Sequence, residues 1–166
     1  MRFRLAGEIK HSLVNGPGIR YVVFFQGCPH HCEGCQNPET HAISGGVEAD
    51  TDDVIQRIRK ARFLDGVTIS GGDPLMQPEA CGVIAKAAHK MGLSVWVYTG
   101  WKMEDILRDD HKREALRYVD ILVDGEFVAA LQAEEPLFRG SSNQRFIKVQ
   151  KALSCNQVVE IWPEEF

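Results

Sequence analysis

Three cysteines and two histidines lie within twelve residues, in the stretch GCPHHCEGCQNP at positions 27–38. The thiols of Cys28, Cys32 and Cys35 follow the spacing C-x3-C-x2-C. Thiols this close together can form a disulfide with one left over, complete a zinc site with a histidine, or bind an iron–sulfur cluster. Each alternative implies a different kind of protein.

The number of cysteines and the neighbouring histidines help to choose between these alternatives. The chain holds five cysteines, an odd number that cannot pair completely, and we expect a cytoplasmic protein, in which thiols stay reduced. A zinc site would take its fourth ligand from His30, His31 or His41. A 4Fe-4S cluster normally has four cysteine ligands, so three would leave one iron open to an exogenous ligand. Zinc and the cluster both remain possible at this point. Cys81 and Cys155 stand alone, and we assign them no role.

The elements around the cysteines predict an α/β fold. Nearly continuous apolar runs, typical of strands covered on both faces, alternate with helical patterns. The expected helices cover residues 49–64, with apolar Val54, Ile55 and Ile58 at helical spacing, the segment from Pro78 to Gly92, and residues 103–118. The expected strands are IRYVVFFQG (19–27), GVTIS (66–70), LSVWVYTG (93–100) and VDILVDG (119–125), with QRFIKVQ and VVEIW as later additions.

Strands alternating with helices favour right-handed crossovers and a parallel sheet. A closed eight-stranded α/β barrel needs about 250 residues, and this chain has 166, so we expect a single domain over residues 1–166 with either an open sheet or a partial barrel. Chemistry in such folds collects at the carboxyl ends of the strands. Four residues follow strands directly and should share one face: Cys28, Gly71, Thr99 and Asp124.

Composition excludes several functional classes. The formal net charge is −4, which argues against a broad basic surface for nucleic acid. No run approaches the roughly 18 apolar residues that span a bilayer, and the first residues lack the apolar core of a signal peptide. We therefore predict a cytoplasmic protein without nucleic-acid or membrane partners.

The cysteine loop after the first of these strands, followed by SGGDP after the next, resembles the radical S-adenosylmethionine superfamily. The resemblance implies a partial TIM-like barrel of parallel strands with outer helices. It also implies a 4Fe-4S cluster held by Cys28, Cys32 and Cys35, with S-adenosylmethionine on the open iron. The glycine-rich turn, here Gly71, Gly72 and Asp73, is then expected to contact the methionine end of the cofactor.

Five further segments narrow this resemblance: VNGPGIR, SGGDPL, WVYTGWK, ILVDGEFV and FRGSSNQR, between residues 14 and 146. Together they are similar to the family of activating proteins that serve the anaerobic ribonucleotide reductase. Gly34 and Gln36 depart from that pattern, since relatives often have aromatic residues there. The resemblance still implies that both residues, with Cys35, contact the cofactor, and that Thr99 and Asp124 belong to the same pocket.

That resemblance implies an oxidoreductase activity. A reduced cluster cleaves S-adenosylmethionine into methionine and a 5′-deoxyadenosyl radical, which removes hydrogen from a backbone glycine and leaves a glycyl radical. The expected partners are the large subunit of the reductase, through its glycine-bearing loop, and a reduced flavodoxin or ferredoxin as electron donor. We also hypothesise that Arg139, Arg145, Lys148 and Lys151 help to dock the reductase.

Two other functions remain as alternatives. A small radical enzyme could act on a metabolite such as a deazapurine, and a zinc-stabilised binding module would use the same cysteines without redox chemistry. The metal content and the identity of the substrate separate the three hypotheses.

Overall fold

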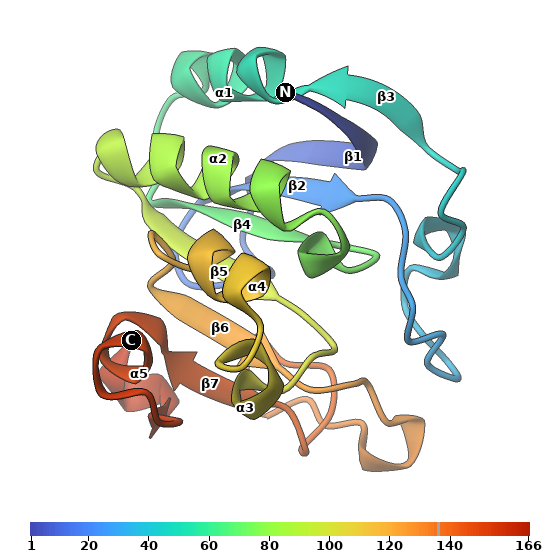
Figure 1. Cartoon of the computed structure of the whole chain (residues 1–166), viewed down its shortest axis with the longest axis vertical. Helices are drawn as coiled ribbons and strands as arrows, with labels where there is room; N and C mark the ends of the chain where they lie inside the picture. The colour runs from blue at the N-terminus through green and yellow to red at the C-terminus, as the bar shows by residue number, and fades with distance from the viewer. Residues whose placement is uncertain (136) are drawn as a thin grey trace.

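One mixed sheet organises the chain, and the computed structural model of the protein describes residues 1–135 and 137–166. The described strands have the spatial order β3-β1-β2-β4-β5-β6-β7-β8 (Figure 1). They are β1 (Arg2–Ser12), β2 (Arg20–Phe25), β3 (Val47–Asp50), β4 (Gly66–Gly71), β5 (Ser94–Tyr98), β6 (Ile121–Asp124), β7 (Arg145–Lys148) and β8 (Glu160–Ile161). The helices are α1 (Thr51–Lys60), α2 (Pro78–Lys90), α3 (Met103–Ile106), α4 (Asp110–Ala115) and α5 (Val149–Cys155).

The centre of the sheet confirms the predicted α/β fold with parallel strands. Strands β2, β4, β5 and β6 pair in parallel. The two ends differ from the prediction, because β1 and β3 on one side and β7 and β8 on the other pair antiparallel. The sheet is not closed. Its α/β class is therefore established, and a partial barrel stays a prediction.

Side chains of the strands alternate between a helix-covered face and an opposite face. In β4, Val67 and Ile69 join the large apolar core, while Thr68 points away from it. That core also contains residues of α1, α2, α4 and α5, and Figure 1 shows α1, α2 and α4 on the same side of the sheet. Because successive side chains of a strand point to opposite faces, the other face is left for a second cluster and for the site.

The opposite face carries a smaller apolar cluster built around Trp96 and Phe146. The C-terminal Phe166 packs on it, with its ring centroid 4.9 Å from each of these two rings. Arg20 lies beside this cluster, and its side chain is fully buried. Its guanidinium carbon is 5.6 Å from the Trp96 ring centroid. The C-terminal segment thus covers part of the face that the helices leave open.

Arg20 fixes the VNGPGIR turn between β1 and β2. Its guanidinium donates to the Pro17 carbonyl (3.0 Å), the Thr68 hydroxyl (2.7 Å) and the Ser94 carbonyl (3.0 Å). The Thr68 hydroxyl in turn donates to the Asn15 carbonyl at 2.6 Å. Burial lowers the pKa of Arg20 to about 10. The turn is therefore tied to β4 and β5 by a cation that contacts no carboxylate directly.

Two helix predictions need adjustment. The expected helix over 49–64 is shorter, because Asp50 caps its start by accepting from the Asp52 N–H. The expected helix over 103–118 is two helices, because the side chain of Asp109 accepts from the Lys112 N–H and begins α4 there.

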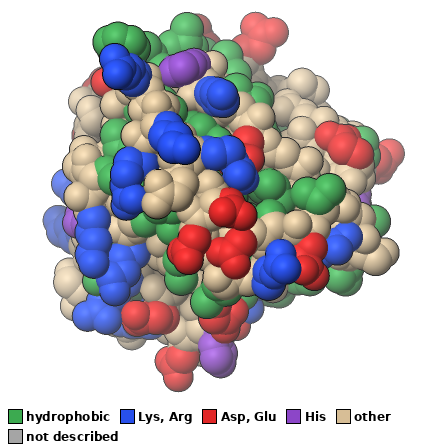
Figure 2. Space-filling model, turned by 90° about the horizontal axis from the view of Figure 1, so that it is seen from above, with side chains coloured by type: hydrophobic (Ala, Val, Ile, Leu, Met, Phe, Trp, Pro, Cys, Tyr) green, Lys and Arg blue, Asp and Glu red, His purple; other side chains and the backbone are tan. Residues whose placement is uncertain are grey.

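Figure 2 looks onto the α1 side of the molecule, where Lys and Arg side chains gather on the left. The last turn of α1 contributes Arg57, Arg59 and Lys60, as a helix C-terminus favours.

Strands β1 and β3 were not predicted. In β1 only Phe3 and Leu5 join the apolar core, at the spacing of two that marks a strand, and most of the other residues of the strand are exposed or half-buried. β3 has four residues and no fully buried side chain. Among the described residues, no helix combines the length and the apolar character that crossing a membrane requires.

We expect the Arg20→Lys substitution to lower the free energy of unfolding by about 2–4 kcal/mol, because a lysine cannot satisfy the separate acceptors around the guanidinium. Denaturant unfolding under reducing conditions measures this loss. The matched control is Arg57→Lys, since Arg57 pairs with Glu8 at the surface and its replacement should cost less than about 1 kcal/mol. Equal losses in both variants would contradict a structural role for the buried cation.

Candidate active site

A cavity of about 390 Å³ opens where the parallel strands end. In Figure 1 the loops that follow β2 and β6 extend beyond the same edge of the sheet. Seven of the residues predicted to bind the cluster or the cofactor line this cavity: Cys28, Cys32, Cys35, Gln36, Gly71, Gly72 and Thr99. The expectation that residues at the ends of separate strands share one face therefore agrees with the geometry for Cys28, Gly71 and Thr99.

The cysteine loop is anchored at its base by backbone hydrogen bonds. The N–H groups of Gly27 and Cys28 donate to the carbonyls of Thr40 (2.7 Å) and His41 (3.1 Å), so the chain returns to its starting point after the loop. Within the loop the Cys35 N–H donates to the Cys32 carbonyl at 3.2 Å. Cys28 is 7% exposed, and the other two thiols are partly exposed. The loop presents three thiols from one short, closed segment.

These thiols fit an iron–sulfur cluster as a donor set. All three are free, and burial raises the pKa of Cys28 and of Cys32, partly offset by backbone N–H groups nearby. Each cysteine of a 4Fe-4S cluster binds a different iron, so the sulfurs need not converge on one point. No three His, Cys, Asp or Glu side chains of the described residues surround a single ion position.

The glycine turn after β4 packs directly against the strand that leads to the cysteines. A Cβ on Gly72 would lie 2.4 Å from the Gly27 carbonyl oxygen, and Gly71 has φ +110° beside the backbone of Phe25. The Gly72 and Asp73 N–H groups donate to the carbonyls of Phe25 (2.7 Å) and Gly27 (2.8 Å). The glycines thus allow two backbone segments to touch. From the sequence, contact with the cofactor is the only role expected of these glycines.

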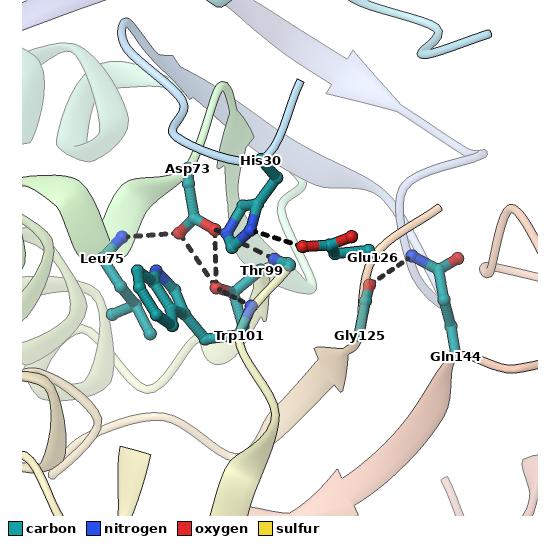
Figure 3. A network of polar contacts seen from close by, with 9 residues as sticks. His30, Asp73, Leu75, Thr99, Trp101, Gly125, Glu126 and Gln144 are labelled. Carbon is teal, nitrogen blue, oxygen red and sulfur yellow. Dashed lines mark hydrogen bonds and ion pairs between the residues drawn. The ribbon is translucent and has the colours of Figure 1, made fainter. Parts of the chain in front are cut away.

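Asp73 lies behind the cavity wall rather than in it. Its carboxylate is fully buried and accepts from the Thr99 hydroxyl (2.9 Å), the Gly100 N–H (2.9 Å) and the Leu75 N–H (3.0 Å) (Figure 3). His30 contacts the same carboxylate through Nε2 at 2.8 Å. We expected this side chain to be available to the cofactor, and the structure instead commits its oxygens to protein groups.

His30 connects the cysteine loop to this carboxylate. Its Nδ1 contacts Glu126 at 3.0 Å, and its ring meets the Trp101 ring edge-on with 5.0 Å between centroids. Burial alone would lower the pKa of His30, but Asp73 and Glu126 outweigh it, and the pKa is raised. A Cβ on Gly100 would lie 2.5 Å from the imidazole, so that glycine makes room for the ring. The ring joins segments that follow β2, β4, β5 and β6.

Asp124 also lies outside the cavity lining. Its carboxylate is 1% exposed, accepts from the Met103 N–H at 2.8 Å and pairs with Arg145 at 2.6 Å. Arg145 also forms an ion pair with Glu104 at 2.7 Å. Both carboxylates hold Arg145 against the sheet, and its part in docking the reductase stays a hypothesis. The next residue, Gly125, does line the cavity.

Several lining residues were not singled out for this role in the sequence. Val14 and Asn15 come from the turn held by Arg20, and Phe127, Phe138 and Gln144 come from the segment after β6. Gln144 donates to the Gly125 carbonyl at 3.0 Å, as Figure 3 shows. Gly34 faces this segment, since a Cβ there would lie 3.4 Å from the Ala129 side chain and 3.7 Å from the Phe127 ring. In the sequence these residues are marked by the quoted segments VNGPGIR, ILVDGEFV and FRGSSNQR, which contain them.

Comparison with known proteins gives consistent matches. A family model described as a 4Fe-4S single cluster domain matches residues 14–147. An anaerobic ribonucleoside-triphosphate reductase-activating protein of Escherichia coli K12 is 35% identical over 142 residues, covering 80% of this chain and 90% of that protein. Proteins of the same name from Haemophilus influenzae (34% over 144 residues, 80% and 90%) and phage T4 (35% over 141 residues, 81% and 86%) match similarly.

We expect Asp73→Asn to lower the free energy of unfolding by about 2–4 kcal/mol, because an amide offers its NH₂ group where the carboxylate accepts from several donors. Denaturant unfolding of the protein measures the loss. Glu126→Gln is the matched control, because its side chain is 57% exposed and its contact with His30 should contribute less than about 1 kcal/mol. An Asp73→Asn variant as stable as the wild type would show that the buried carboxylate does not hold the segments together.

The ion pair of Glu104 with Arg145 makes a pH-dependent contribution to the free energy of unfolding. Its hydrogen bond to Arg145 lowers the pKa of Glu104 from 4.5 to about 2. A lowered carboxyl pKa stabilises the fold above the unfolded pKa, and that stability is lost as the pH falls through the folded one. Glu104→Gln should therefore cost less than about 1 kcal/mol at pH 7, given the exposure of the pair, and the cost should vanish between pH 4.5 and 2.

Urea unfolding of wild type and Glu104→Gln at several pH values between 7 and 2 checks this expectation. Glu114→Gln serves as control, because its pair with Arg117 is exposed on both sides and should show no comparable change. A Glu104→Gln difference that stays constant over the acid range would contradict the assignment.

Proposed function

The chain belongs to the family of anaerobic ribonucleoside-triphosphate reductase-activating proteins, and we propose that it activates such a reductase by forming a glycyl radical in it. The proposed reaction is the reductive cleavage of S-adenosylmethionine at a 4Fe-4S cluster, giving methionine and a 5′-deoxyadenosyl radical that takes a hydrogen from a backbone glycine of the reductase. The protein would then be a radical S-adenosylmethionine oxidoreductase.

One observation carries this proposal: the three free thiols of a short loop line one cavity at the carboxyl edge of the sheet, within the span of the matching cluster domain. Cys28, Cys32 and Cys35 would hold the cluster as thiolates, since metal binding displaces their protons. Three protein ligands would leave one iron of such a cluster free to bind the amino and carboxylate groups of the cofactor. The cluster and cofactor supply the redox chemistry, and the protein supplies binding and orientation.

The other predicted residues divide by their position. Gly71 and Gly72 expose backbone at the cavity wall, where an amino group would find carbonyl acceptors, and Thr99 and Gln36 line the same space. Asp73 and Asp124 support the site through neighbours, because both carboxylates are buried and already paired. Gly34 would act through the segment that it faces. These roles are proposals for each residue.

We further propose a curved, incomplete barrel as the architecture of the site. Its support is the placement of the helices on one face and of the cavity-lining turn and C-terminal ring on the other. The glycine-bearing loop of the reductase would enter from the open edge. A reduced flavodoxin or ferredoxin is the proposed electron donor, and the reaction belongs in the cytoplasm.

We expect the protein isolated without oxygen to contain about four irons and to form 5′-deoxyadenosine when reduced with dithionite in the presence of S-adenosylmethionine. Addition of the reductase should give a glycyl radical visible by electron paramagnetic resonance. Replacing Cys28, Cys32 or Cys35 singly by alanine should remove the cluster signal and both activities, because three thiols are the minimum set.

Cys155→Ala is the matched control, since this thiol is exposed and outside the cavity lining. It should retain iron and activity. Zinc in place of iron in anaerobically prepared wild type, or loss of iron in the control to the same extent, would contradict the proposal.

A further inference from the structure

We infer that the reductase docks on an apolar rim at the mouth of the cavity, an inference that rests on the proposed function. The rim is defined by exposed apolar residues from two segments. The turn between β1 and β2 contributes Leu13 and Val14. The segment after β6 contributes Val128, Leu131 and Leu137.

All five side chains of the rim are exposed to solvent. Leu13 and Val14 are 70% and 77% exposed, and Leu137 is 64% exposed. Single exposed apolar residues are common on protein surfaces and need no explanation. Here, however, two segments more than 100 positions apart in the sequence bring such residues to one opening.

The cavity lining places both segments at that opening. Val14 itself lines the cavity, and so do Phe127 and Phe138, the direct neighbours of Val128 and Leu137. A polypeptide that reached into the cavity beside these segments would therefore meet their exposed apolar side chains. Apolar side chains at that position would lose water on contact, which is the usual driving force of a protein interface.

Both segments are held in place before any partner arrives. The Pro17 and Asn15 carbonyls of the turn are fixed by Arg20 and Thr68. In the other segment the Tyr98 hydroxyl donates to the Phe138 carbonyl at 2.6 Å, and the Ser142 N–H donates to the Leu131 carbonyl at 2.8 Å. A rigid surface loses little conformational entropy on binding. The buried cation thus supports a turn whose apolar tip is left in water.

The size of the cavity also favours a macromolecular substrate. Its volume of about 390 Å³ lies near the lower end of the roughly 300–1,000 Å³ that sites for a single small ligand occupy. A cluster and one nucleotide cofactor would occupy most of that space. The substrate must then reach the reacting atoms from outside, as a loop presented by a larger protein can.

Arg139 adds a positive charge beside the rim. It lines the cavity, and its Nη1 donates to the Gln144 carbonyl at 2.9 Å. Arg145 of the same segment is instead committed to Glu104 and Asp124.

The test compares Leu13→Asp and Leu131→Asp with wild type, as reconstituted holoproteins and full-length reductase. Neither residue lines the cavity. We expect each variant to bind the reductase about tenfold more weakly in an anaerobic titration, because a charge replaces an apolar contact. The yield of glycyl radical at subsaturating reductase should fall in proportion. Cleavage of S-adenosylmethionine without reductase should be unchanged, and Leu13→Ser is a milder variant should Leu13→Asp fold poorly.

Phe63→Asp is the matched control, because Phe63 is 83% exposed and lies in the connection between α1 and β4, outside the cavity lining. It should bind the reductase as the wild type does. Unchanged affinity of the rim variants, or an equal loss in the control, would overturn the inference. A change in self-association without a change in reductase affinity would assign the rim to a second copy of this chain and overturn it as well. If the wild type fails to cleave S-adenosylmethionine, the proposed function fails, while the affinities still decide the docking surface.

Discussion

The buried carboxylate of Asp73 is the interaction on which the geometry of the site depends. It receives hydrogen bonds from the segment after β4 and from the segment after β5, and it contacts His30 of the cysteine loop. An unpaired buried carboxylate would be costly, because desolvation of a charge costs several kcal/mol. The donors around it offset that cost only while all these segments stay together. The buried charge thereby holds together the segments that follow separate strands.

The central strands could be predicted from the sequence because they are covered on both sides. Continuous runs such as YVVFF leave no polar face, which is typical of a strand covered on both faces. Strands β1 and β3 at one edge carry no such signal. β1 buries Phe3 and Leu5 near one end, and β3 has no fully buried side chain, so their pairing depends on contacts distant in the sequence. The break before α4 follows from one capping side chain, Asp109, which an apolar periodicity does not reveal.

The candidate site divides in the same way. The spacing of the cysteines and the glycines after β4 indicated which residues would meet, because the carboxyl ends of parallel strands share one edge. What the sequence could not give is the direction in which a polar side chain turns. Asp73, Thr99 and Asp124 all lie at or just beyond the ends of strands, yet the two carboxylates turn to protein donors outside the cavity lining, while Thr99 is part of that lining. That choice depends on partners such as His30 and Arg145, which are distant along the chain.

The turn that covers part of the face opposite the helices explains why the chain maintains a buried arginine. The carbonyls of that turn are turned toward the sheet and need donors. A guanidinium presents five N–H groups in a fixed plane and can satisfy several carbonyls at once. Arg20 therefore joins the Pro17 carbonyl of the turn to the Val67 and Ser94 carbonyls of β4 and β5. These hydrogen bonds offset the cost of its desolvation, and the turn that they hold contributes Val14 and Asn15 to the cavity lining.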